Sequence, residues 1–173
     1  MKGLLIVIVL LYLLSLNSCG TKNKEKTVEE ITDVTKQEVM FQNLLKIVSL
    51  TDSRSLVNDS LAFLILPLQA SCPACRKKTI DSIVKHQKEL NDGHFIVISA
   101  NGGKKTMSAF FREQQYELPV NKQLYLDSTN AGWRYDLYKD NTVFYYAYNR
   151  KVYRKVTAVP ATIKSDLKEF FSN

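Results

Sequence analysis

The strongest constraint on the fold is a continuous apolar run, Leu61–Leu66, followed six residues later by the motif Cys72-Pro73-Ala74-Cys75. An uninterrupted run of this length predicts a β-strand buried on both faces, as in a parallel sheet covered by helices. Pro73 suits the first turn of a helix, where the missing N–H of proline costs nothing. The pattern therefore predicts a buried strand that leads directly into a helix, with two cysteines at the start of that helix.

The rest of the chain alternates predicted strands and helices. Helices are expected at 73–90, 104–116, 131–138 and 163–171, strands at 61–66, 94–100, 123–126, 142–148 and 151–156, and residues 37–50 fit a helix leading into a strand. Alternating βα units imply a parallel core, and the final hairpin adds an antiparallel edge. The predicted fold class is α/β, a central mixed sheet with a C-terminal antiparallel hairpin, flanked by helices.

The N-terminal segment carries a separate signal. Lys2 precedes the apolar stretch Gly3–Leu16, which is shorter than the ~20 residues of a membrane span and fits a secretory leader. The stretch ends in Leu16-Asn17-Ser18-Cys19, which resembles the lipobox of bacterial lipoproteins. That resemblance implies cleavage after Ser18 and acylation of Cys19, whose two or three acyl chains, such as palmitate, anchor firmly. The alternative is an uncleaved anchor with an incidental cysteine.

These signals divide the 173 residues into three parts. Residues 1–18 are predicted as the lipoprotein signal peptide, residues 19–36 as the acylated cysteine and a polar tether, and residues 37–173 as one folded domain. The expected location is the cell envelope, lipid-anchored and facing the periplasm. Gly20 stands where an Asp often marks inner-membrane retention, which favours the outer membrane.

The formal charge of +7 limits the classes of partner. It is compatible with acidic partners or a lipid headgroup surface. The basic residues are scattered, and no groove-reading motif accompanies them, so nucleic-acid binding is not expected.

The cysteine pair itself suggests thiol–disulfide exchange. Unpaired N–H groups and the positive end of the helix dipole favour the thiolate of Cys72, and basic side chains follow at 76–78. Cys75 lies one turn further on and is expected to be less exposed. Cys72 would attack a substrate disulfide, and Cys75 would resolve the mixed disulfide.

A strand that leads into Cys-x-x-Cys within this βαβ order resembles the thioredoxin fold. The most similar group is the membrane-anchored, TlpA/ResA-like thiol–disulfide oxidoreductases, and the resemblance covers residues 61–171. Leu118-Pro119-Val120 and Tyr125-Leu126-Asp127 resemble that group's Pro-Val…Asp segment. The resemblance implies protein thiols or disulfides as substrates, a redox donor or acceptor in the envelope, and no cofactor. Members of the group are reductases, but Cys-Pro-Ala-Cys does not fix the direction.

Two other uses of the cysteine pair remain open, an inert structural disulfide and a metal site. Structural zinc needs four ligands, and the chain has no second cysteine pair. His86 and His94 are interpreted as surface or strand-start residues. A peroxiredoxin would carry Thr or Ser in place of Gln69.

The sequence departs from the thioredoxin pattern before the motif. Ser71 replaces the usual Trp, and Leu66 replaces the buried acid that serves the second cysteine. The carboxylates considered as substitutes are Glu89, Glu113 and Glu117.

A further departure concerns the proline that is cis in this fold and faces the disulfide. Alignment of the hairpin places Asn141 there, and a cis bond before a non-proline residue costs ~3–4 kcal/mol. We therefore predict a trans Asp140–Asn141 bond, or a strained cis bond if the site demands it. The loss of this proline supports a second hypothesis, a non-catalytic binding lipoprotein on a thioredoxin scaffold. It also keeps metal binding open.

Overall fold

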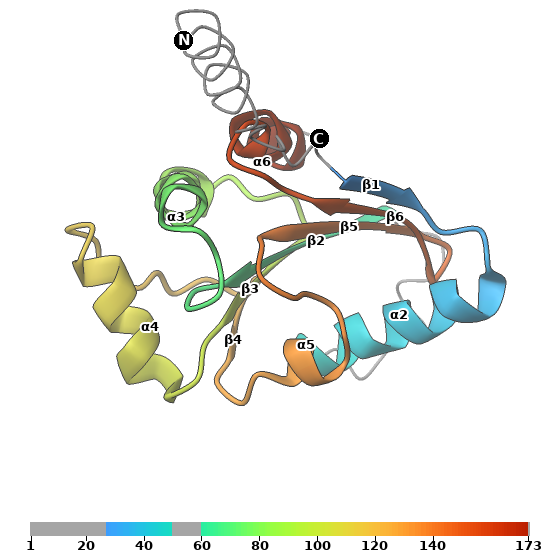
Figure 1. Cartoon of the computed structure of the whole chain (residues 1–173), viewed down its shortest axis with the longest axis horizontal. Coiled ribbons are helices and arrows are strands. Elements are labelled where there is room, and N and C mark those ends of the chain that lie inside the picture. Colours follow the sequence, from blue (N-terminus) through green and yellow to red (C-terminus); the bar gives the residue numbers. More distant parts are fainter. Residues whose placement is uncertain (1–26, 50–59, 173) are drawn as a thin grey trace, which may run out of the picture.

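The computed structural model describes residues 27–49 and 60–172, which form a six-stranded sheet with helices on both faces (Figure 1). In chain order the elements are β1 (Thr27–Glu30), α2 (Val34–Ile47), β2 (Ser60–Pro67), α3 (Pro73–His86), β3 (His94–Ser99), α4 (Gly103–Arg112), β4 (Leu124–Asp127), α5 (Ala131–Arg134), β5 (Val143–Tyr148), β6 (Lys151–Thr157) and α6 (Ile163–Ser172). The predicted leader and Cys19 lie outside the described residues. Within the described ranges, no helix is long and apolar enough to span a bilayer.

The strands follow the order β1-β6-β5-β2-β3-β4 across the sheet. Strands β2, β3 and β4 are parallel, whereas β5 runs antiparallel to β2, and β6 antiparallel to β5. Asn149 and Arg150 connect β5 to β6 with φ values of 50° and 64°, the left-handed pair that a two-residue hairpin turn requires. The predicted parallel core and antiparallel hairpin are both confirmed.

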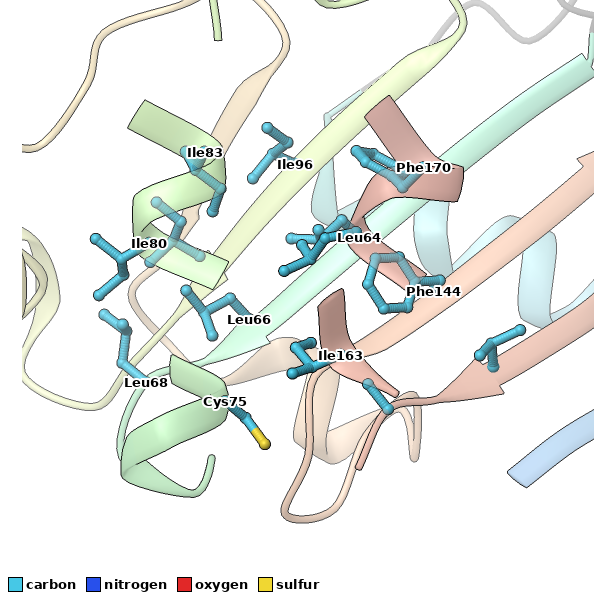
Figure 2. Close-up of a cluster of buried hydrophobic side chains, with 14 of the residues drawn as sticks. Leu64, Leu66, Leu68, Cys75, Ile80, Ile83, Ile96, Phe144, Ile163 and Phe170 are labelled. Atoms are coloured by element: carbon cyan, nitrogen blue, oxygen red, sulfur yellow. The ribbon is translucent and has the colours of Figure 1, made fainter. Parts of the chain in front are cut away.

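Strand β2 lies at the centre and serves two hydrophobic cores. Ala62, Leu64 and Leu66 face the core under α3, α4 and α6, while the alternate side chains face α2 and α5. Figure 2 shows Leu64 and Leu66 within the first of these cores. Leu64 and Leu66 are fully buried, and each such side chain contributes about 1.5–3 kcal/mol relative to exposure. The apolar run thus places the loop that follows Pro67 at the end of a central strand that is buried on both faces.

The N-terminal boundary of the domain differs from the prediction. Residues 27–36, expected as polar tether, contribute β1 and the start of α2. Strand β1 pairs antiparallel with β6, which sets Glu29 opposite Lys155 and Glu30 opposite Arg154. The acidic residues Glu29 and Glu30, which suggested a solvated tether, instead lie opposite basic residues of β6.

The fold is thioredoxin-like, as predicted. A central strand leads into the cysteine helix, a parallel strand follows on one side, and the antiparallel hairpin and final helix complete the other side. Helix α5 is shorter than expected, because Asp136 adopts a left-handed conformation with φ 53° soon after Arg134.

Candidate active site

The two cysteines lie at the start of α3, directly after the loop that leaves β2. Cys72 is the N-cap residue of α3, and Pro73 occupies the first turn. The backbone N–H of Cys75 donates to Cys72 Sγ at an N···S distance of 3.1 Å. The sulfur of Cys72 thus takes the place of a capping oxygen, and the end of the helix offers it one of the N–H groups that would otherwise lack a partner.

The two thiols differ sharply in environment. Cys72 is partly exposed, whereas Cys75 is 1% exposed and belongs to the core that Figure 2 shows. Burial raises the pKa of the Cys75 thiol well above its usual range, and the neighbouring Cys72 sulfur raises it further, while Lys78 opposes the shift. Both thiols are free. The predicted division into an accessible and a buried cysteine is present.

The basic residues after the motif each have their own partners. The Arg76 guanidinium donates to the carbonyls of Leu68 at 2.9 Å and Ser71 at 3.4 Å, and it stacks over the Phe110 ring. Lys77 pairs with Asp81 at 3.4 Å. Arg76 therefore holds the loop that carries the motif, and Lys78 favours the thiolate of Cys75.

The residues at the cis-proline position keep ordinary geometry. Within the described ranges no peptide bond is cis, so the Asp140–Asn141 bond is trans, as predicted. The next residue, Thr142, is fully buried, and its hydroxyl lies 3.5 Å from that of Thr79. Thr79 also donates to the Cys75 carbonyl at 2.9 Å. This pair of hydroxyls connects the cysteine helix to the start of β5, a link that no sequence motif indicated.

None of the carboxylates considered as partners for Cys75 is buried. Glu89, Glu113 and Glu117 are exposed, and no carboxylate is among the main influences on the pKa of Cys75. The acid buried on this face of the sheet is Asp166 in α6, which is 1% exposed and accepts from the Thr162 hydroxyl at 2.8 Å. Asp166 is an acid on the apolar face of the terminal helix, and this position is the sequence signal that could have identified it.

A polar cluster lies beside the motif at the same end of the sheet. The carboxylate of Asp127 accepts from Ser99 Oγ at 2.8 Å and from the backbone N–H groups of Ala131 and Gly132 at 2.8 and 2.9 Å. Ser99 Oγ also lies 2.6 Å from Tyr138 Oη. This cluster fixes α5 against the ends of β3 and β4.

An open pocket of about 400 Å³ connects this cluster to the loop before the cysteines. Its walls are Pro67, Gln69, Ala70, Ser99, Asn101, Asn130, Trp133, Tyr138 and Lys139. Gln69 and Asn101 tie its rim together, since the Asn101 N–H donates to Gln69 Oε1 at 2.8 Å. Trp133 is 61% exposed. The pocket begins two residues before Cys72, and sequence analysis did not find it.

The histidines are engaged in packing. His86 stacks on Phe171, and His94 meets the edge of Phe170, where burial lowers its pKa. Within residues 27–49 and 60–172, no group of three or more His, Cys, Asp or Glu side chains has the arrangement of a metal site. Both histidines occupy the surface and strand-start positions that were predicted.

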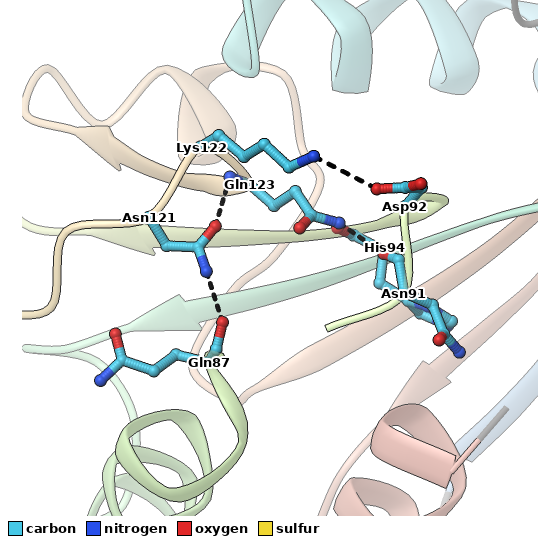
Figure 3. A network of polar contacts seen from close by, with 7 residues as sticks. All are labelled: Gln87, Asn91, Asp92, His94, Asn121, Lys122 and Gln123. Atoms are coloured by element: carbon cyan, nitrogen blue, oxygen red, sulfur yellow. Dashed lines mark hydrogen bonds and ion pairs between the residues drawn. The ribbon is translucent and has the colours of Figure 1, made fainter. Parts of the chain in front are cut away.

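A different polar network, shown in Figure 3, holds the opposite end of β3. Asn121 and Gln123 fold back on the ends of α3 and β3, where Gln123 donates to the His94 carbonyl at 3.0 Å. Lys122 pairs with Asp92 at 3.3 Å. These contacts close the ends of α3 and β3 remote from the cysteines and bring no second reactive group to the motif.

Comparison with known proteins gives structural likeness alone. No family model and no curated protein matches the chain. Among solved structures, a DsbF homologue from Corynebacterium diphtheriae aligns with a TM-score of 0.38 and 11% identity over 66% of this chain and 74% of that chain. A secreted Mycobacterium tuberculosis disulfide oxidoreductase homologous to E. coli DsbE gives 0.38 and 12%, over 68% and 87%. The bacterioferritin comigratory protein of Xanthomonas campestris gives 0.39 and 16%, over 69% and 81%.

Proposed function

We propose that this protein is a lipid-anchored, extracytoplasmic thiol–disulfide oxidoreductase that exchanges a Cys72–Cys75 disulfide and dithiol with protein substrates. One observation carries the proposal. A partly exposed cysteine caps a helix at the end of the central strand, and a second, buried cysteine donates its backbone N–H to the first sulfur. An accessible nucleophile with a shielded resolving thiol one turn away is what two-step exchange requires.

The reaction balances as two displacements. The Cys72 thiolate attacks one sulfur of a substrate disulfide, the substrate S–S bond breaks, and one substrate thiolate leaves. The Cys75 thiol gives up its proton, and its thiolate attacks Cys72 Sγ, which releases the second substrate thiolate and forms the Cys72–Cys75 disulfide. The substrate gains two electrons and the protein loses two. The reverse sequence oxidises a substrate dithiol.

The buried second cysteine makes the second displacement the demanding one. Its raised pKa keeps the Cys75 proton in place until the mixed disulfide has formed and the negative charge on Cys72 is gone. Lys78 favours the Cys75 thiolate at that stage.

The pocket before the motif is the surface on which we place the substrate chain. Trp133 forms one wall of it and is the only tryptophan in the protein. In a Cys75→Ser variant, a peptide trapped on Cys72 is expected to change the Trp133 fluorescence. A peptide without a thiol is the control.

The proposed location rests on the leader. Gly3–Leu16 and the Leu16–Cys19 lipobox support export and acylation of Cys19, and Gly20 favours the outer membrane. Together with the motif, these features support an assignment to the TlpA/ResA-like group. Mass spectrometry of the N-terminal peptide from bacterial membranes tests the assignment: an unmodified Cys19 or an intact leader contradicts it.

The decisive experiment is a redox titration of the chain from Gly20 onward, which keeps β1 intact, against glutathione or dithiothreitol. A reversible two-electron transition between about −120 and −270 mV supports the enzyme and indicates its direction, with Cys72→Ser and Cys75→Ser as controls. A disulfide that resists reduction below about −300 mV, or thiols that never pair, contradicts it.

A second candidate function is a non-catalytic binding lipoprotein on the same scaffold. Two observations favour it: the trans bond at Asn141 and the absence of a carboxylate among the main influences on Cys75. Alkylation separates the two functions. Rapid modification of Cys72 at neutral pH supports the oxidoreductase, and an inert Cys72 supports the binding protein.

A further inference from the structure

A basic groove runs between α3 and α6, which pack side by side on one face of the sheet (Figure 1). Each helix contributes one face at three- and four-residue spacing, and the lining of the groove includes Lys78, Asp81, Lys85, Lys164, Lys168 and Phe171. The oxidoreductase chemistry at Cys72 uses none of these except Lys78.

The positive charge of the groove is not neutralised by the described part of the chain. Lys85, Lys164 and Lys168 are exposed, and neither they nor Lys78 form an ion pair with another described residue. The single acid in the groove, Asp81, is paired with Lys77 at 3.4 Å. Lysine side chains from two helices therefore converge on one surface and leave an excess positive charge.

The chain enters the domain beside this groove. Thr27, the first described residue, pairs with Thr157 at the end of β6, six residues before α6 begins. Arg154 connects the two elements, because it contacts Glu30 of β1 at 3.9 Å and Glu169 of α6 at 2.6 Å. Seven residues separate Cys19 from Thr27, and the eight extended residue steps from one to the other span at most about 28 Å.

We propose that the α3–α6 groove docks on the anionic headgroups of the membrane to which the chain is anchored. The inference rests on the membrane anchoring in the proposed function and is independent of its redox chemistry. A short attachment beside α6 keeps this face near the bilayer, and each lysine near an anionic surface favours contact by about fivefold. The half-buried Phe171 adds apolar contact between the lysines.

Docking on this face sets where the nucleophile works. Lys78 lies six residues after Cys72, about 9 Å along the axis of α3. Contact through the groove therefore holds Cys72 close to the membrane surface, within reach of substrates that are themselves attached to or emerging from the bilayer.

Lysine acetylation of the full chain tests the proposal. The protein is inserted into vesicles of phosphatidylcholine alone, or of phosphatidylcholine with phosphatidylglycerol, and the rate at each lysine is read by mass spectrometry. We expect Lys85, Lys164 and Lys168 to be acetylated several-fold more slowly on the anionic vesicles, and the protection to disappear in high salt. Lys46, on the opposite face of the sheet, and Lys122 are internal controls.

A charge-matched pair of variants removes ambiguity. Replacing the four groove lysines with Gln is expected to abolish the lipid-dependent protection of the flanking Lys88. The same substitution at Lys46, Lys104, Lys105 and Lys122 is expected to retain it. Equal acetylation of the groove lysines on both vesicles overturns the proposal and leaves an acidic protein as the partner that fits the groove.

The mass of the chain separates this test from the proposed function. Either a lipid on Cys19 or an uncleaved leader holds the domain at the bilayer. The acetylation result therefore tests docking through the groove in both cases. An unmodified Cys19 contradicts the lipoprotein assignment alone, and an inert Cys72 contradicts the oxidoreductase alone.

Discussion

Two polar clusters share one end of the sheet and are built in opposite ways. The Asp127 cluster is saturated, because its carboxylate accepts from Ser99, Ala131 and Gly132. The cysteine cluster is not: Cys75 keeps its proton in an apolar core, and the buried Ser71 hydroxyl has no partner among the described residues. A fully hydrogen-bonded network is rigid, and we call the Asp127 cluster the brace for that reason. A buried polar group without a partner instead marks a position of strain or of chemical function.

The largest effect is expected at the brace. Asp127→Ala leaves the backbone N–H groups of Ala131 and Gly132 without their acceptor and removes one acceptor of Ser99 Oγ, so the free energy of unfolding should fall by about 3 kcal/mol. Urea unfolding measures the loss. Asp92→Ala, which removes a 96%-exposed carboxylate, is the matched control and should change stability by less than about 0.5 kcal/mol. Equal values for the two variants would contradict the brace.

The two buried serines sharpen the comparison, since both are at most 3% exposed. Ser99→Ala removes a hydroxyl that contacts Asp127 and Tyr138 and should cost about 1–2 kcal/mol. Ser71→Ala removes a hydroxyl without a described partner and should raise stability by about 1 kcal/mol. Opposite signs in urea unfolding are the expected result, and a loss in both variants would show that Ser71 is satisfied.

The hydroxyl link between the cysteine helix and β5 should contribute less. Thr79→Val keeps the shape but removes the contacts to the Cys75 carbonyl and to Thr142, at a cost of about 1 kcal/mol. Thermal unfolding reports it. The exposed Ser165→Ala is the control, and an unchanged midpoint for Thr79→Val would mean that the link carries no stability.

The smallest effect is a pH slope set by Cys75. Its pKa is raised in the folded protein, so its contribution to stability is complete below the unfolded thiol pKa of about 8.5 and declines as the pH rises above it. The urea midpoint of the reduced protein should fall more steeply above that pH than that of Cys75→Ser. The Cys72→Ser variant should keep most of the slope.

Local patterns predicted the core of the fold because they describe local physics. The Leu61–Leu66 run, the proline after Cys72 and the hairpin letters at Asn149 each determine their own segment. Strand β1 escaped prediction because Thr-Val-Glu-Glu is only a good strand opposite Lys155 and Arg154, which lie more than a hundred residues away.

The candidate site divides in the same way. Helix geometry predicts the exposed and buried cysteines, since capping acts over one turn. The Asp127 cluster, the Thr79–Thr142 contact and the Trp133 pocket depend on how three strands end together, which periodicity does not encode. The segment before α5 resembled that of known oxidoreductases, but nothing in its letters indicated the hydrogen bonds that hold it.

The pairing of β1 with β6 has a mechanical consequence. The chain enters the fold through a four-residue ladder at the rim of the sheet, so a pull on the N-terminus loads that ladder first. Tension is borne by Arg154 and the Glu29–Lys155 register before it reaches β2 and the cysteine loop. The pairing of β1 with β6 is therefore expected to break first under load, while Cys72 and Cys75 keep their relative positions.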